Sequence, residues 1–212
     1  MNRWFLFLGL GALALATGCT STSAMQTARV VNEGEYRFLL AGGLFQTNAL
    51  SSTDPDKVYQ PYFEGATRFG FAPSWDLGLK VTAPGMVTGD LKAELYTDEA
   101  WAFSLGAGVG YLFVKDRGAD DYFDQDVIDV LVPLYLSYDF SDAFSAYISP
   151  RAVWRSFKKE YWLLGAAAGV RIGNALGLIL EFSGAHDLQS DFSQYQAGVG
   201  FFFGSPHARN NP

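Results

Sequence analysis

Residues 75–96 read WDLGLKVTAPGMVTGDLKAELY, with apolar residues at every second position on both sides of a Pro-Gly break. The apolar places are Leu77, Leu79, Val81 and Ala83 against Asp76, Gly78, Lys80 and Thr82, then Leu91, Ala93 and Leu95 against Asp90, Lys92 and Glu94. A period of two is typical of a β-strand with two unlike faces. The pattern fits a soluble sheet with an apolar core and equally a membrane barrel with an apolar exterior.

The N-terminus has the features of a secretory signal. One base, Arg3, precedes an apolar run over residues 4–16, and small residues follow up to Cys19. The run is shorter than the ~20 residues that a membrane-spanning helix needs. Its end, Leu-Ala-Thr-Gly-Cys, resembles the lipobox of bacterial lipoproteins. That resemblance implies that residues 1–18 are removed and that Cys19 is acylated.

Residues 19–33 are expected to form a lipidated, flexible tether. Cys19 is the only cysteine in the chain, so it has no intramolecular disulfide partner. Residues 20–32, TSTSAMQTARVVN, are rich in Ser and Thr and lack an apolar period, which is typical of a linker. By the lipoprotein resemblance, the absence of Asp after the cysteine favours the outer over the inner membrane.

The composition narrows the class of protein. The chain has 15 bases and 22 acids, and loss of Arg3 with the signal leaves a net charge of −8, which argues against nucleic acid as a partner. Charged residues make up 17% and aromatic residues 16%, a low share of charge for a soluble surface. No apolar stretch after the signal is long enough for a membrane helix. A mature chain that enters a membrane must therefore do so as a closed barrel.

The repeating pattern predicts an all-β fold, a closed antiparallel up-and-down transmembrane barrel of about ten strands over residues 34–203, with eight or twelve strands as alternatives. The expected strands are 34–46, 58–71, 75–84, 87–97, 101–113, 126–139, 143–156, 160–173, 175–186 and 191–203. Most reach the ~9–11 residues that cross a bilayer at a tilt.

The connections alternate in length. A mostly longer set lies at 47–57, 85–86, 114–125, 157–159 and 187–190, and a tight set at 72–74, 98–100, 140–142 and 174. Short turns on one side and longer loops on the other are typical of membrane barrels. Since an even number of strands returns the chain to its starting side, both termini, the tight turns and a tail over 204–212 are expected at the periplasmic face.

The two faces of the strands differ in charge. The apolar face carries no charge, and its members are Tyr36, Phe38, Leu40, Leu44, Leu77, Leu79, Val81, Ile128, Val130, Val132, Leu134, Leu136, Trp162, Leu164, Val170, Ile172, Leu176, Leu178, Leu180 and Phe182. The opposite face is expected to form a paired network in the lumen, with Glu64, Arg68, Asp76, Lys80, Asp90, Lys92, Glu94, Asp129, Arg151, Arg155, Arg171 and Glu181. Charges confined to a narrow interior are costly unless they pair, so a largely plugged lumen is favoured over a conducting pore.

The ends of the strands carry aromatic residues. One set, at the tight turns, is Phe71, Trp75, Tyr96, Trp101, Phe140, Phe144, Phe201 and Phe203, and the other, at the longer loops, is Tyr59, Tyr111, Trp154, Trp162 and Phe192. Such girdles are typical of bilayer interfaces.

With these features the chain resembles the outer-membrane β-barrel proteins of Gram-negative bacteria. Residues 198–203, GVGFFF, are similar to the C-terminal assembly signal of that group, although Ala197 replaces a preferred polar residue and a tail follows. The resemblance implies membrane lipid, lipopolysaccharide and the barrel assembly machinery as partners. It rests on architecture and identifies no subfamily.

The sequence has no established catalytic motif, and no cofactor, metal or enzymatic activity is expected. His186-Asp187 lies near Ser183, Ser190 and Asp191, which allows a Ser-His-acid site, although a polar loop tip explains the pair as well. The acidic loop over 115–126 lacks the spacing of a calcium site.

Three functions remain. The first is a structural, adhesive or minor transport barrel, the second a surface enzyme acting on lipid or peptide through His186, and the third a tethered soluble periplasmic barrel that binds an apolar ligand.

Overall fold

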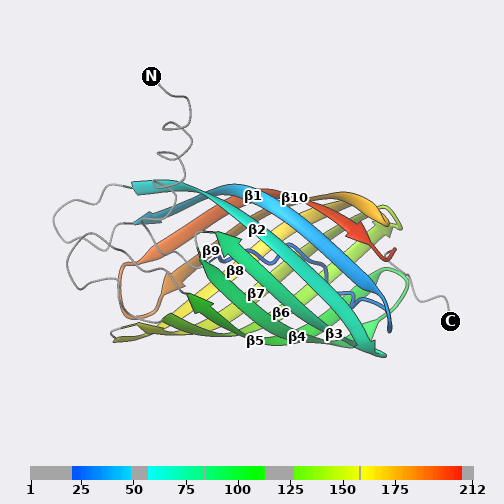
Figure 1. Ribbon diagram of the computed structural model, residues 1–212, viewed down its shortest axis with the longest axis horizontal. Coiled ribbons are helices and arrows are strands. Elements are labelled where there is room, and N and C mark those ends of the chain that lie inside the picture. Colours follow the sequence, from blue (N-terminus) through cyan, green and yellow to red (C-terminus); the bar gives the residue numbers. More distant parts are fainter. Residues whose placement is uncertain (1–20, 49–56, 84, 113–126, 158, 207–212) are drawn as a thin grey trace, which may run out of the picture.

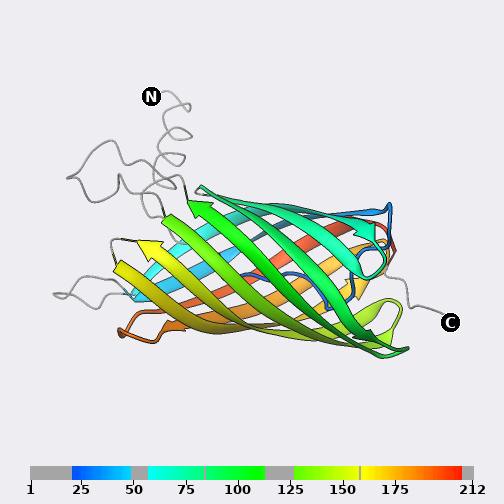
Figure 2. The ribbon, with the colours of Figure 1, turned by 90° about the horizontal axis from the view of Figure 1, so that it is seen from below.

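Ten antiparallel strands close into one barrel in the computed structural model, which describes residues 21–48, 57–83, 85–112, 127–157 and 159–206. The strands are β1 (Tyr36–Asn48), β2 (Lys57–Ala72), β3 (Trp75–Ala83), β4 (Met86–Thr97), β5 (Trp101–Leu112), β6 (Val127–Ser141), β7 (Phe144–Phe157), β8 (Lys159–Gly173), β9 (Leu176–Asp187) and β10 (Ser193–Gly204). Each pairs with its neighbours in sequence, and β1 pairs with β10 to close the sheet (Figures 1 and 2). The expected fold class is confirmed, with ten strands.

The connections divide the barrel into two ends. The turn end has the short connections 73–74, 98–100, 142–143 and 174–175, and the loop end has those at 49–56, 84–85, 113–126, 158 and 188–192. Register shifts interrupt the ladders between Gly70 and Ala72, between Glu94 and Tyr96, and between Asp139 and Ser141, all near the turn end. The shift in β4 leaves the consecutive residues Leu95 and Tyr96 both exposed outside.

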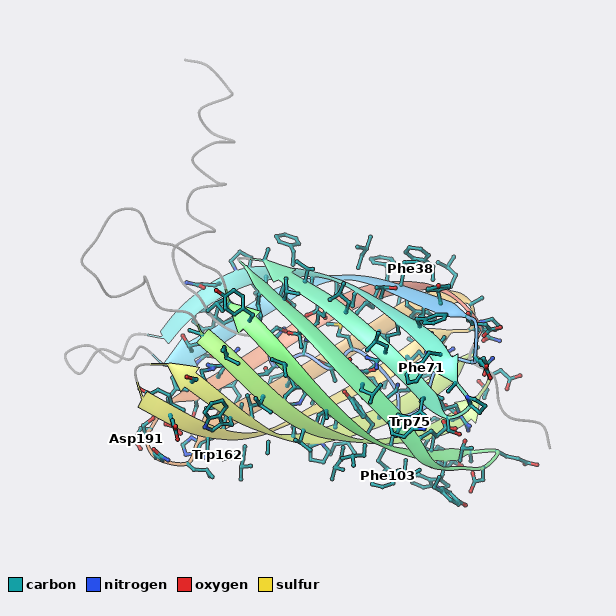
Figure 3. All side chains as sticks on the ribbon, turned by 60° about the horizontal axis from the view of Figure 1, so that its bottom comes forward. Phe38, Phe71, Trp75, Phe103, Trp162 and Asp191 are labelled. Carbon is teal, nitrogen blue, oxygen red and sulfur yellow. The ribbon has the colours of Figure 1, made fainter. Side chains whose placement is uncertain are left out.

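The apolar face of the strands lies on the outer surface of the barrel. Leu77, Leu79 and Val81 are each about half exposed, whereas Asp76, which precedes Leu77 in β3, is fully buried. Side chains with this outward direction cover the wall in Figure 3. Among the described residues no helix is long and apolar enough to span a membrane.

Exposed aromatic rings lie at both ends of the wall. Phe71 and Trp75 mark the turn end and Trp162 the loop end in Figure 3. Rings also stack along the turn end, as Tyr36 does on Phe69 at 4.6 Å and Phe38 on Phe203 at 5.3 Å between centroids. Two aromatic belts therefore border the apolar wall.

Residues 21–32, which we name the luminal segment, run inside the barrel (Figures 1 and 2). The chain leaves the turn end at Gly34, whose amide donates to the carbonyl of Gly70, and then enters β1. Thr27, Ala28 and Arg29 are at most 2% exposed. The sequence predicted a flexible tether here, and the structure differs because the segment's polar groups find partners on the charged inner wall that no local pattern reveals.

Candidate functional site: a polar lumen with an internal segment

The lumen holds the side chains that the sequence assigned to it, and several form ion pairs. Arg68 of β2 contacts two acids, Asp76 of β3 and Asp90 of β4, the second at 2.7 Å. Gly78 lies opposite both Arg68 and Asp90 in the ladders, and a Cβ at this glycine would overlap both charged groups. The absence of a side chain at position 78 therefore lets an ion pair cross over β3.

Three further ion pairs lie on the inner wall. Arg155 binds Asp129 directly opposite on β6, with both oxygens accepting at 2.8 and 3.0 Å, in the bidentate geometry typical of strong pairs. Lys92 lies 3.5 Å from Asp76, which it shares with Arg68. Lys80 lies 3.9 Å from Glu64.

The other four residues of the expected network have different partners. Among the described residues, Arg151 donates only to the Ser149 hydroxyl, and Arg171 donates to the Ser145 hydroxyl and the Asn174 carbonyl. Neither guanidinium has a carboxylate partner within that part of the chain.

Glu94 and Glu181 serve the backbone of the luminal segment instead of a basic side chain. The amides of Ala24 and Met25 both donate to the Glu181 carboxylate, the first at 2.8 Å, and the Tyr147 hydroxyl donates to it at 2.5 Å. The Val30 amide donates to Glu94 at 3.4 Å. Carboxylates that accept backbone N–H groups replace the ladder partners that this irregular segment lacks.

Other wall residues accept hydrogen bonds from further amides of the segment. The Val31 amide donates to Asp76 at 2.9 Å, and the Thr22 amide donates to Gln196 at 3.0 Å. The Ala28 amide donates to the Ser137 hydroxyl at 3.3 Å.

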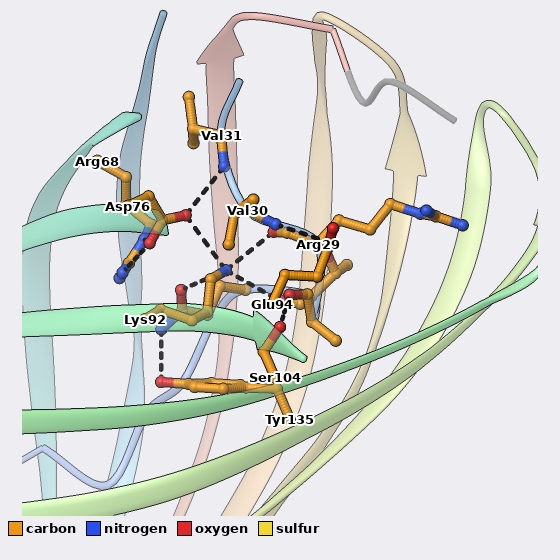
Figure 4. Close-up of polar contacts among 12 residues, drawn as sticks. Arg29, Val30, Val31, Arg68, Asp76, Lys92, Glu94, Ser104 and Tyr135 are labelled. Atoms are coloured by element: carbon orange, nitrogen blue, oxygen red, sulfur yellow. Dashed lines mark hydrogen bonds and ion pairs between the residues drawn. The ribbon is translucent and has the colours of Figure 1, made fainter. Parts of the chain in front are cut away.

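Basic and hydroxyl groups of the wall bind the segment's carbonyls. Lys92 donates to the carbonyls of Thr27 and Arg29 at 3.1 and 2.9 Å. Figure 4 shows Lys92 beside Arg29 of the segment. Lys80 donates to the Ser23 carbonyl at 2.9 Å. Hydrogen bonds to charged groups each contribute about 1.5–3 kcal/mol, which is comparable with the about 1–2 kcal/mol that ordering each backbone residue costs. Many such bonds together hold the segment.

Arg29 is the most strongly bound side chain of the luminal segment. Its Nε donates to Asp139 at 2.5 Å, and its terminal nitrogens donate to the Thr97 hydroxyl at 2.5 Å and the Asp98 carbonyl at 2.8 Å. Because Thr97 and Asp98 border the 98–100 turn, this contact fixes the segment at the turn end. The sequence analysis missed both members of the pair: the strand period places Asp139 on the inner face, but Arg29 lies in a stretch without any period.

Apolar side chains of the luminal segment pack against apolar residues of the inner wall. Met25 packs with Leu39, Ile179 and Phe202, all of them buried. Ala28 is fully buried against Ala102 and Tyr135. A cavity of about 100 Å³ remains beside the segment, which leaves room for a few water molecules at about 30 Å³ each.

The segment runs lengthwise through the lumen. Val31 and Arg29 contact residues at the turn end, whereas Thr22 contacts Gln196 and Ser183. Gln196 and Ser183 lie nearer the loop end of β10 and β9 than the turn end. The chain therefore crosses more than half of the barrel between residues 33 and 21.

The residues around His186 do not assemble into the Ser-His-acid site that the sequence allows. His186 faces outward, where its Nδ1 lies 2.9 Å from the Ser193 hydroxyl. Asp187 is buried on the opposite face and accepts from Ser190, and Ser183 contacts Thr22 in the lumen. No described carboxylate contacts His186.

Two predicted features lie outside the described residues: the acylated Cys19 and the acidic loop over 115–126. Within the described ranges, no group of three or more His, Cys, Asp or Glu side chains is arranged to hold a metal ion.

Comparisons with known proteins report similar barrels among solved structures. The N-terminal β-barrel domain of Pseudomonas aeruginosa OprF is 15% identical over 79% of this chain and 97% of its own, with a TM-score of 0.39. The translocator domain of the autotransporter NalP from Neisseria meningitidis is 11% identical over 94% of both chains, with a TM-score of 0.46. The outer membrane protease OmpT from Escherichia coli is 11% identical over 85% of this chain and all of its own, with a TM-score of 0.42. No protein-family model and no curated protein sequence matches the chain.

Proposed function

We propose that this protein is an outer-membrane β-barrel whose lumen is closed by its own luminal segment, and that it serves a structural or adhesive role in the cell envelope. The observation that carries the proposal is the seating of residues 21–32 in the lumen, where wall side chains bind the backbone at both N–H and C=O groups. A lumen filled in this way provides little room for steady transport of solutes.

The membrane location is supported by the surface of the wall. An apolar belt of exposed Leu, Val, Ile and Phe residues surrounds the barrel between two aromatic borders, as expected of a wall in contact with lipid. A closed barrel leaves no unpaired strand edge in the bilayer. The signal-like N-terminus and the β10 sequence Gly198–Phe203 favour the outer membrane, with membrane lipid and lipopolysaccharide around the wall and the barrel assembly machinery as the partner in folding.

The soluble-barrel alternative requires the opposite arrangement of faces. A barrel that binds an apolar ligand inside needs an apolar interior, whereas the described interior is lined by ion pairs and by the luminal segment. The direction of the side chains therefore favours lipid contact over internal ligand binding.

Electrical recordings in planar bilayers test the closed lumen. We expect no steady conductance from the wild-type protein. A variant with residues 21–32 replaced by an equal length of Gly and Ser should conduct ions, because it loses the Arg29 and Met25 side chains and its glycines cost more conformational entropy to order along the wall. Leu77→Ala, a change on the outer wall, serves as the control and should stay closed. Large, stable currents from the wild type would contradict the proposal.

The course of the luminal segment also bears on the orientation of the termini. With the turn end in the periplasm, the tail after Gly204 is periplasmic, as expected from the sequence. Ser21, however, lies beside Glu64 and Gln196 within the lumen, on a path that leads away from the turn end. We therefore propose that the mature N-terminus leaves at the loop end, on the cell-surface side, and that an acyl group on Cys19 would be carried there.

Epitope tags distinguish the two locations. A tag inserted between residues 20 and 21 should bind antibody on intact cells, whereas a tag after Pro212 should bind only after permeabilisation. Antibody binding to the first tag only after permeabilisation would instead place the N-terminus in the periplasm.

Lipid hydrolysis at the outer wall is a second candidate function, favoured by one contact. His186 and Ser193 lie 2.9 Å apart beside an outward groove of about 380 Å³ lined by Leu164, Phe182 and Tyr195. If this pair is catalytic, purified protein should hydrolyse phospholipid and Ser193→Ala should abolish the activity. Absence of hydrolysis by the wild type would remove this candidate.

A further inference from the structure

Two arginines inside the turn end form no ion pair with any residue that the structure describes. Arg37 of β1 makes no hydrogen bond or ion pair with any residue that the structure describes, and its buried Nε is without a partner. Arg171 of β8 is 2% exposed and binds only neutral oxygens, the Asn174 carbonyl at 3.1 Å and the Ser145 hydroxyl at 3.5 Å. Its Nε is also buried without a partner. An unsatisfied donor on a buried charge is costly.

The guanidinium groups of Arg37 and Arg171 lie in the same part of the lumen. Both side chains line the luminal cavity, and their charges repel each other there. The Arg171 guanidinium lies 5.1 Å from the ring centroid of Phe202, which pairs across the ladder with Leu39, two residues beyond Arg37. Two like charges, each with an unpartnered Nε donor, therefore line one small cavity.

The neighbouring carboxylates are already engaged. Arg68 lies directly opposite Arg37 in the β1–β2 ladder and binds Asp76 and Asp90. Asp139, the acid that acts on Arg171, is bound by Arg29 at 2.5 Å. Like charges directly opposite on neighbouring strands are destabilising, and the attraction of Asp76 and Glu35 reaches Arg37 without an ion pair or a hydrogen bond.

We propose that Arg37 and Arg171 bind a phosphate group that enters from the turn end. A guanidinium presents several donors in a fixed plane and binds phosphate oxygens well, and a tetrahedral phosphate offers acceptors to both residues at once. Arg37 follows the first residue of β1, and Arg171 reaches the 174–175 turn through the Asn174 carbonyl. Both residues therefore lie at the turn end, where free phosphate and phospholipid headgroups are the two sources of such a group.

Calorimetric titration of the full chain in detergent with inorganic phosphate, at constant ionic strength, tests the site. We expect the wild type to bind and Arg37→Gln and Arg171→Gln each to bind at least tenfold more weakly. Arg151→Gln is the matched control, because Arg151 lines the same cavity and has a buried unpartnered Nε but lies in the middle of β7 and not at the turn end. Heat-modifiable migration on a denaturing gel verifies that each variant is folded.

Two outcomes overturn the proposal: no phosphate binding by the folded wild type, or equal loss of binding in the Arg151→Gln variant. Soluble short-chain phosphatidic acid separates the two sources of phosphate. Tighter binding of this lipid than of inorganic phosphate assigns the site to a headgroup, and equal binding assigns it to the free anion; either result supports the site.

Thermal unfolding provides an independent readout. Without phosphate, Arg37→Gln should leave the unfolding midpoint unchanged or raise it, since the variant removes a charge opposite Arg68. With phosphate, the midpoint of the wild type should rise because a ligand that binds the folded state stabilises it, and the midpoint of Arg37→Gln should not. A lower midpoint for the folded variant without phosphate would show that Arg37 already has a structural partner and would contradict the inference.

Discussion

Leu79 and Lys80 are neighbours in β3 whose side chains lie on opposite sides of the wall. Leu79 is 50% exposed outside, and Lys80 donates to the Ser23 carbonyl in the lumen. In a bilayer, Leu79→Arg places a guanidinium among lipid chains at a cost of about 2–4 kcal/mol. We expect this variant to assemble poorly, measured as outer-membrane yield of heat-modifiable protein, and Lys80→Arg, which keeps the luminal charge, to assemble almost normally.

A bilayer-restricted thiol label distinguishes lipid contact from a mere folding defect at the same two positions. With Cys19 acylated and unreactive, the label should modify a cysteine at 79 and not one at 80. Modification at 80 alone, or at neither position, would contradict the assignment of the Leu79 face to lipid.

The turn between β4 and β5 is organised by one exposed carboxylate. The amides of Trp101 and Ala100 donate to Asp98 at 2.6 and 2.8 Å, and the Tyr96 hydroxyl donates to it at 2.7 Å. These donors, the Trp101 amide foremost, lower the pKa of Asp98 below its ordinary value of 3.8. A group with a lowered pKa in the folded state stabilises that state above its unfolded pKa, and the stabilisation is lost as the pH falls through the folded pKa.

We therefore expect Asp98→Asn to lower the urea midpoint of unfolding at neutral pH and to have a smaller effect at a pH well below 3.8. Asp98→Ala removes the acceptor as well as the charge and should be destabilising at both pH values. An equal loss for Asp98→Asn at both pH values would show that its charge has no part in the turn.

At the scale of the whole molecule, the wall and the luminal segment are separate sources of stability. The ladder between β1 and β10 closes the sheet without help from residues 21–32. The Gly and Ser replacement of these residues should therefore still give a heat-modifiable barrel. Its thermal midpoint should be lower, because Asp139 loses the Arg29 side chain, the apolar cluster loses Met25, and glycines cost more conformational entropy to order. Failure of that variant to form any barrel would show instead that the segment is needed for closure.

The alternation of apolar and polar residues in the sequence by itself determined the strands of the barrel wall and their apolar and polar faces. Positions such as Leu77 and Asp76 differ so strongly in polarity that a one-residue shift would reverse both faces, and tight turns and strand-end aromatics mark the strand boundaries. The all-β fold and a count of about ten strands follow from these local signals, with eight and twelve left open until the β1–β10 ladder is seen.

Only the tertiary structure decided what fills the lumen and which charges meet. Residues 21–32 have no period, and their partners, among them Glu181 and Asp139, lie more than 100 residues away in sequence. The contact of Arg68 with Asp90 depends on the register of β2, β3 and β4 and on the missing side chain at Gly78. Closure of the sheet brings such distant groups together, and hydrogen bonds between them depend on position in space rather than on any repeat along the chain.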